Sequence, residues 1–253
     1  MTLQIALLGK DGVLIASDTR VLKTKLSGIE PIQIYEHEDK VILNSPKTVA
    51  VAWSDNKPSG GFILAALDAF DSEWGKESSS LSKLCWNLWE KEKEKRQCEP
   101  IDCTLLIAKS KEKQIYKARF SRTDPMEIVA KPESLMRSGL VAGNDTNSAC
   151  FFIHRYLPKE LVATGRLAKW AAHYILMGGK INPHGVDGLS VHISKNGGVF
   201  KRLSERRLRQ LESESNRLDG LISDVLFSKK YGGGLGQSGQ RSKRITPPPA
   251  ITQ

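Results

Sequence analysis

The sequence predicts an α+β fold in which antiparallel β-sheets stack on each other and helices cover their outer faces. Two observations lead to this prediction. Turn residues repeatedly separate pairs of short apolar runs, a pattern typical of β-hairpins. Between these hairpins the helical patterns come in pairs rather than singly after each strand, and this order argues against a doubly wound parallel sheet.

Each predicted strand is a short apolar run bounded by turn residues. The expected strands span residues 3–8, 13–16, 41–43, 49–52, 103–108, 115–120, 140–143, 189–193 and 199–203. In the first hairpin the two runs flank Lys10-Asp11-Gly12, and Gln4 is the only polar residue of the first run. A polar loop is expected over about residues 21–39.

Helices are predicted where apolar residues recur at helical spacing. They are expected over residues 60–70, 81–89, 147–156, 161–177 and 205–227. A run of mixed charge at 90–96 continues the second helix and is expected to be its solvated end. The last helix carries an apolar stripe that includes Leu208, Leu211 and Leu218.

The composition favours one folded domain with an appendage. Of the 253 residues 40% are hydrophobic, which suffices for a sizeable core, and no apolar run approaches the ~18 residues of a membrane span. We expect a domain over residues 2–203, an amphipathic helix over 204–228 and a disordered, basic Gly/Pro-rich tail over 229–253. The tail holds +5 of the net charge of +10, so no nucleic-acid partner is expected, and no membrane partner either.

Several kinds of functional site are not predicted. The four cysteines form no Cys-x-x-Cys pair and the five histidines form no metal-spaced cluster, so we expect reduced thiols, no metal and no cofactor. Neither a phosphate-binding P-loop nor a Gly-x-Ser-x-Gly nucleophile motif is present. The N-terminus lacks the basic region of a signal peptide, and we expect a cytoplasmic protein.

Thr2 directly follows the initiator methionine, and threonine is small enough for that methionine to be removed. Removal would leave Thr2 with a free α-amine, whose ordinary pKa of about 7.7–8.0 allows it to act as a base near neutral pH. An N-terminal threonine can therefore hold nucleophile and general base in one residue. Many proteins carry threonine at this position for no catalytic reason, so the surrounding sequence must decide whether Thr2 is a candidate nucleophile.

That context resembles proteasome-type subunits, in which the mature chain starts with threonine. The resemblance is carried by the turn Gly9-Lys10-Asp11-Gly12 and by Asp18-Thr19-Arg20, whose aspartate lies sixteen residues after Thr2, as it does in that family. It extends over roughly residues 2–203. It implies a bacterial or archaeal proteasome β-subunit homologue, that is, an N-terminal-nucleophile hydrolase with a four-layer αββα sandwich.

The same resemblance implies a catalytic set. Thr2 would be the nucleophile, Lys40 the buried cation that stabilises its alkoxide, and Asp18 the partner of Lys40. Lys40 fits the lysine of the family because it opens an apolar strand, whereas the weaker alternatives Lys23 and Lys25 do not.

Further positions follow with less support from the motifs. A backbone N–H near Trp53 or Ser54 would form the oxyanion hole, and the Trp53 side chain would shape the substrate site. Arg20 would support the end of its strand.

At three more positions the sequence departs from the family pattern. Asn144 follows Gly143 where the family has a serine, while His184 and Asp187 stand where it has an aspartate and a serine. Asn182 is another candidate for the missing aspartate. These auxiliary groups would tune the amine, so rate and specificity depend on them.

The predicted function is that of a threonine peptidase or amidase acting on a peptide or protein substrate. The resemblance also implies a homo-oligomer, and it leaves open an ATPase or another partner. Two alternatives are a non-catalytic structural subunit with the same fold and a connectase-like transpeptidase. Connectases and bacterial ancestral-β-subunit proteins also begin with threonine after methionine, so the sequence does not separate hydrolysis from transfer to an amine.

Overall fold

The structure is a computed structural model of the chain. It describes residues 2–27, 30–55, 62–64, 66–68, 87, 90, 94, 103–120, 127–132, 139–143, 160–181 and 186–227. The chain divides into two compact units, Met1–Glu212 and Ser213–Gln253, and all of the described strands lie in the first. The expected divisions at residues 203 and 228 stay predictions.

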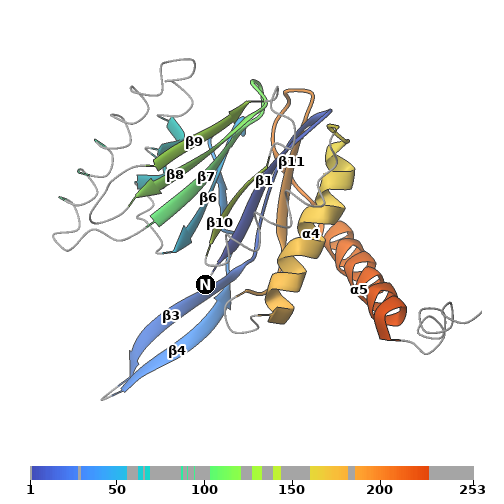
Figure 1. The fold of residues 1–253 in the computed structure, drawn as a ribbon. Helices are drawn as coiled ribbons and strands as arrows, with labels where there is room; N and C mark the ends of the chain where they lie inside the picture. The colour runs from blue at the N-terminus through green and yellow to red at the C-terminus, as the bar shows by residue number, and fades with distance from the viewer. Residues whose placement is uncertain are drawn as a thin grey trace, which may run out of the picture. The chain divides into compact units, whose positions relative to one another are not determined.

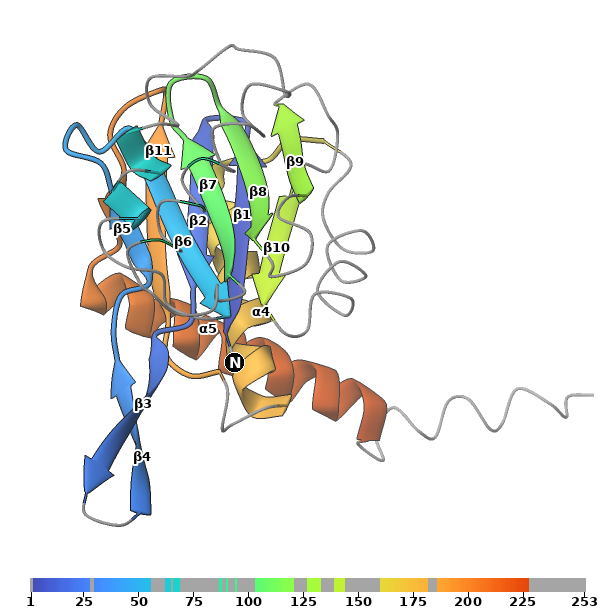
Figure 2. The same ribbon diagram turned by 90° about the vertical axis from the view of Figure 1, so that its left-hand side faces the viewer.

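Two five-stranded antiparallel sheets form the body of the first unit (Figures 1 and 2). The first sheet has the order β10-β1-β2-β11-β12 and the second β5-β6-β7-β8-β9. The first contains β1 (Leu3–Gly9), β2 (Gly12–Ser17), β10 (Gly139–Gly143), β11 (Ser190–Lys195) and β12 (Lys201–Arg202). The second contains β5 (Val41–Leu43), β6 (Val49–Asp55), β7 (Cys103–Lys109), β8 (Gln114–Phe120) and β9 (Glu127–Pro132). The α+β class with antiparallel sheets is therefore confirmed.

An apolar layer separates the two sheets. Its members alternate along each strand with residues that face outward, as the two-residue period of a strand requires. They include Ala6, Leu8, Val13 and Ile15 from the first sheet and Ala50, Ala52, Leu106 and Ala108 from the second. Because β1 and β2 are buried on both faces, their sequences read as continuous apolar runs rather than as alternating ones.

Helix α4 (Thr164–Ile181) covers the outer face of the first sheet, where Leu167 and Ile175 share an apolar cluster with Ile5 and Leu7. Helix α5 (Glu205–Phe227) begins in the first unit, and its Leu208 joins the same cluster. Within the described residues, no helix is long and apolar enough to cross a membrane.

On the outer face of the second sheet, the described helical residues 62–64 and 66–68 include Phe62, whose ring packs edge-on against Phe120 at 5.2 Å. The rest of the expected helix at 60–70, most of the one at 81–89 and all of the one at 147–156 lie outside the described residues. A complete four-layer sandwich therefore stays a prediction.

A two-stranded ribbon occupies the segment for which we predicted a polar loop, so that prediction was wrong. Strands β3 (Arg20–Ser27) and β4 (Glu30–His37) pair from Arg20↔His37 to Ser27↔Glu30 and extend away from both sheets (Figures 1 and 2). They pair only with each other and lie outside both large sheets. Their sequences contain no continuous apolar run, which is the pattern on which the other strands were predicted. The ribbon starts soon after Asp18 and ends shortly before Lys40, and thereby brings these two residues together.

Candidate active site

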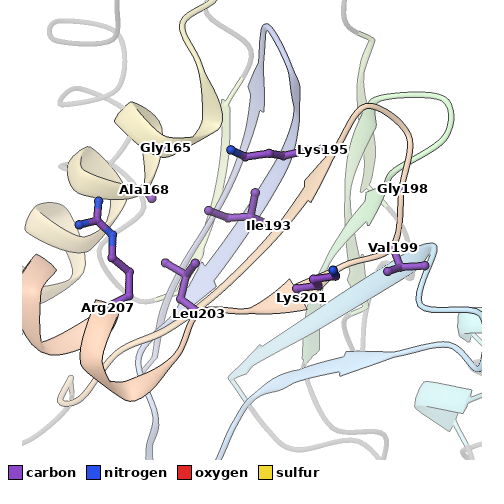
Figure 3. A pocket seen from close by; sticks show the side chains of 9 residues that line it. All are labelled: Gly165, Ala168, Ile193, Lys195, Gly198, Val199, Lys201, Leu203 and Arg207. Atoms are coloured by element: carbon purple, nitrogen blue, oxygen red, sulfur yellow. The ribbon is translucent and has the colours of Figure 1, made fainter.

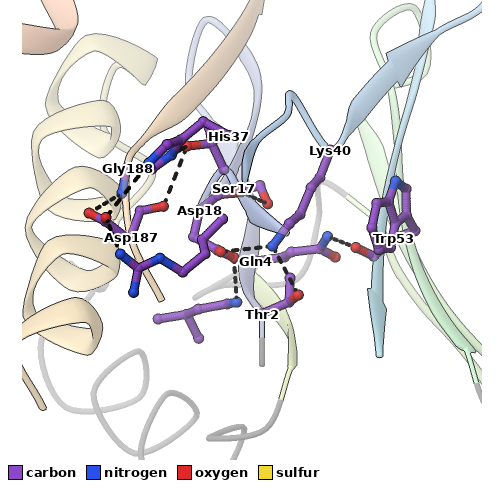
Figure 4. A network of polar contacts seen from close by, with 12 residues as sticks. Thr2, Gln4, Ser17, Asp18, His37, Lys40, Trp53, Asp187 and Gly188 are labelled. Atoms are coloured by element: carbon purple, nitrogen blue, oxygen red, sulfur yellow. Dashed lines mark hydrogen bonds and ion pairs between the residues drawn. The ribbon is translucent and has the colours of Figure 1, made fainter. Parts of the chain in front are cut away.

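Thr2, Asp18 and Lys40 meet at one end of the sheets (Figure 4). The Lys40 ammonium donates to Thr2 Oγ1 at 3.0 Å and to Asp18 Oδ2 at 2.7 Å. The side chains of Lys40 and Asp18 are 1% and 0% exposed, and Thr2 is buried as well. One ammonium group thus joins a hydroxyl to a carboxylate out of contact with bulk water.

The first hairpin fixes the positions of Thr2 and Asp18. Thr2 precedes β1 and Asp18 follows β2, and the two strand ends are tied by reciprocal hydrogen bonds. The Leu3 N–H donates to Asp18 Oδ1 at 2.8 Å, and the Asp18 N–H donates to the Leu3 carbonyl at 3.0 Å. Lys40 arrives from the segment that leads into β5, so the two halves of the site belong to different sheets.

Gly143, the last residue of β10, packs directly against the backbone of Thr2. It pairs with Leu3 and has a φ of 121°. A Cβ at this position would lie 1.8 Å from the Thr2 carbonyl oxygen. A side chain at Gly143 would therefore displace Thr2, and only glycine adopts such a φ without strain.

Burial dominates the electrostatics of the pair. It raises the pKa of the Asp18 carboxyl above its ordinary value, against the opposing effects of Lys40 and of the Leu3 N–H. Burial likewise lowers the pKa of the Lys40 ammonium, although Asp18 and Glu38 favour its charged form. Each charge therefore depends on the other, and a lysine with a lowered pKa gives up its proton more readily than an exposed one.

Two more polar contacts start from the first sheet, and the first of them is buried and reaches the second sheet. The Gln4 side-chain N–H donates to the Trp53 carbonyl, and Gln4 Oε1 is buried without a partner among the described residues (Figure 4). His192 Nε2 of β11 lies 3.0 Å from Asp39 Oδ2. Burial acts to raise the pKa of Asp39, but the contacts with His192 and the hydrogen bonds from Val41 and Ser190 together lower it.

Trp53 and Ser54, the residues expected near the oxyanion hole, make contacts of different kinds. The Trp53 ring lies 5.9 Å from the Lys40 ammonium, but its side chain belongs to the apolar cluster on the outer face of the second sheet. The Ser54 hydroxyl lies 3.5 Å from the Thr104 carbonyl of β7. The Trp53 side chain therefore packs away from the layer between the sheets, and the expected oxyanion N–H stays a prediction.

Of the auxiliary residues, the structure describes Arg20 and Asp187 and brings them together. They form an ion pair at 2.7 Å, and the Asp187 carbonyl accepts hydrogen bonds from the N–H groups of Thr19 and Arg20. These contacts of Asp187 hold Thr19 and Arg20, which directly follow Asp18 in the sequence. The predicted Asn144 and His184, and the alternative Asn182, lie outside the described residues. No group of three or more His, Cys, Asp or Glu among the described residues is placed to hold a metal ion.

Solved structures resemble this chain over most of its length, although no family model and no curated protein matches it. Anbu, the ancestral beta-subunit, from Yersinia bercovieri has a TM-score of 0.60 and 14% identity, covering 88% of this chain and 97% of its own. A Gly-1 mutant of Anbu from Hyphomicrobium sp. strain MC1 has a TM-score of 0.57 and 11% identity, covering 89% and 98%. The fold is proteasome-like. At this level of identity, the likeness shows the fold alone.

These neighbours correct the family that the sequence suggested. The motifs from Thr2 to Arg20 indicated a proteasome β-subunit, but the structures named above are Anbu proteins, which are proteasome-like by fold. The identification as a proteasome β-subunit homologue was therefore wrong. The error has a physical reason. The turn and the Asp-x-Arg motif reflect the geometry of the first hairpin, and proteins of one fold can keep this geometry while the rest of their sequences diverge.

Proposed function

We propose that this chain is a threonine-dependent peptidase or amidase in which Thr2, after removal of Met1, attacks a peptide carbonyl. The observation that carries the proposal is the buried contact of 3.0 Å between Lys40 Nζ and Thr2 Oγ1, with Asp18 on the same ammonium. A hydroxyl that accepts a hydrogen bond from a buried cation is stabilised as it becomes an alkoxide.

In the first half of the reaction, Thr2 Oγ bonds to the carbonyl carbon and its proton passes to the Thr2 α-amine, directly or through a water molecule. Lys40 stabilises the charge that develops on Oγ, and its positive charge favours the neutral form of the neighbouring amine, which can then accept the proton. The scissile C–N bond then breaks, and the leaving amine takes the proton from the α-ammonium. The acyl group remains on Thr2 as an ester.

In the second half, the α-amine takes a proton from water, and the hydroxide formed attacks the ester carbonyl. The bond between the acyl carbon and Thr2 Oγ breaks, and Oγ recovers its proton. Asp18 does not contact the substrate in this scheme. Its role is to keep the Lys40 ammonium charged and oriented. The product is the carboxylate of the cleaved peptide.

Three further features belong to the proposal. Helices over the second sheet would complete an αββα sandwich, supported by the packing of Phe62 on Phe120. We also propose a homo-oligomer, supported by the likeness to proteins named as ancestral beta-subunits. The cysteine pattern supports a cytoplasmic location.

The test is peptide cleavage by the wild type, Thr2→Ser and Thr2→Val. Cleavage of a mixed peptide library by the wild type, reduced cleavage by Thr2→Ser and none by Thr2→Val would support the proposal. Thr2→Val keeps the shape of the side chain but lacks the hydroxyl, so it separates chemistry from folding. Equal cleavage by Thr2→Val and the wild type would contradict the proposal.

A further inference from the structure

A hollow separate from the Thr2 site lies between the first turns of α4 and α5, over the β11–β12 edge of the first sheet (Figure 3). Its volume is about 660 Å³, within the range of ligand sites in proteins. It sits beside Lys195, which pairs with Gly12, whereas Ser190 pairs with Ser17 at the Thr2 end. Five residues of strand, roughly 17 Å, separate these two pairings.

The hollow exists because small residues on α4 face it. Gly165 and Ala168 line it from α4, and a Cβ added at Gly165 would meet no atom within 4 Å. Ile193 and Leu203 form an apolar floor from below, as Figure 3 shows. The helical layer thus leaves part of the sheet uncovered where a larger side chain could have filled the space.

The polar groups around this floor are all cationic. Lys195, Lys201 and Arg207 line the hollow, and none of the described residues that line it is acidic. Lys195 lies 3.8 Å from Asp11, whose carboxylate also accepts the Thr164 N–H at the start of α4 at 2.6 Å. Figure 3 shows Arg207 reaching from α5 toward α4.

We propose that this hollow binds a small amphipathic carboxylate, that is, an anionic head group on an aliphatic or aromatic body. Binding buries the hydrocarbon body of the ligand against the apolar floor, which stabilises the complex. The three cations favour a negatively charged head group at the rim over a neutral or positive one. The site shares no residue with Thr2, Asp18 or Lys40, so the proposal is independent of the peptidase activity.

The probes are octanoate and octanol, which share a chain and differ in charge. Each is titrated into the full-length protein, and displacement of the fluorescent anion anilinonaphthalene sulfonate reports binding. We expect octanoate to bind with a dissociation constant below about 1 mM and octanol to bind at least tenfold more weakly. Equal affinities for octanoate and octanol would overturn the anionic class of ligand, and stronger displacement by an acidic peptide than by octanoate would overturn a small amphipathic molecule as the ligand.

Gly165→Phe fills the hollow without meeting a neighbour at its Cβ, and replacing a helical glycine does not weaken the helix. Gly220→Phe is the matched control, because Gly220 is also helical and open but does not line the hollow. Gly165→Phe is expected to weaken octanoate binding at least tenfold and Gly220→Phe to leave it unchanged. Unchanged binding by Gly165→Phe would overturn the location.

The cationic rim has its own matched pair on α5. Arg207→Gln is expected to weaken octanoate binding several-fold and leave octanol binding unchanged, because only the carboxylate uses the charge. Arg206→Gln removes the same charge one residue away, outside the lining, and is expected to change neither. Equal effects of the two substitutions would show that net charge alone attracts the anion, and would overturn the proposed site.

Discussion

Removal of the Lys40 ammonium should destabilise the fold severely, and a second substitution should reverse much of the loss. Lys40→Met retains the length of the apolar stem but removes the ammonium partner of Asp18, which is 0% exposed and keeps the hydrogen bond of 2.8 Å from the Leu3 N–H. Removing one partner of a buried ion pair costs about 3–5 kcal/mol, because the other charge stays buried without compensation. We expect a loss of that size in the free energy of unfolding at pH 7.5.

The direction in which the pKa of Asp18 is shifted determines how the stability of Lys40→Met depends on pH. Burial raises the pKa of Asp18 in the folded protein, and the loss of Lys40 removes the main opposing effect. Between the unfolded and the folded pKa values, the folded state then binds more protons than the unfolded chain. Stability therefore falls as pH rises through the folded pKa, and the deficit of Lys40→Met should shrink as pH falls from 7.5 to 5.

The assay is urea unfolding followed by circular dichroism, at both pH values, for the wild type, Lys40→Met and the double variant with Asp18→Asn. The neutral amide can still accept the Leu3 N–H, so the double variant should be more stable than Lys40→Met at pH 7.5 and should show no comparable pH dependence. A loss below about 1 kcal/mol for Lys40→Met, or a double variant no more stable than the single one, would refute the buried pair.

Two further substitutions probe the geometry around Thr2. Gly143→Ala should lower stability by about 1–3 kcal/mol and also slow acylation of Thr2, because the new Cβ meets the Thr2 carbonyl. Gly12→Ala, which clashes with Ser194 at the far turn, should lower stability without slowing acylation, and equal slowing would count against the proposed contact. Gln4→Leu should slow acylation about tenfold with a stability change near 1 kcal/mol, since it removes a directional link between the sheets. An unchanged rate of labelling by a β-lactone would show that this link does not position Thr2.

Local patterns in the sequence were sufficient for the β1–β2, β5–β6 and β7–β8 hairpins and for the long helices α4 and α5. The continuous apolar runs of β1 and β2 reflect strands buried on both faces, and the Lys10-Asp11-Gly12 turn marks their connection. The β3–β4 ribbon escaped prediction because its sequence contains no continuous apolar run, and β9 was not predicted either. Strand order escaped it too, because β11 pairs with β2 across most of the length of the chain.

The candidate site was accessible from sequence only through resemblance. Nothing local relates Thr2 to Lys40, which lie on different sheets and meet through a fold that must form first. Gln4 did leave a signal, as the single polar residue of its strand, but its target could not be read from the pattern. The contact between Asp39 and His192 joins residues 153 positions apart and leaves no local signal at all.

The proposal that Thr2 is an N-terminal nucleophile is tested most directly by its reaction with a peptide epoxyketone, followed by mass-spectrometric peptide mapping. This probe closes a ring only when a hydroxyl and a free α-amine belong to the same residue. We expect protein that has lost Met1 and carries a single adduct on Thr2, with no adduct in Thr2→Val, as this proposal requires. Protein from its native host that retains Met1, or an adduct on another residue, would contradict it.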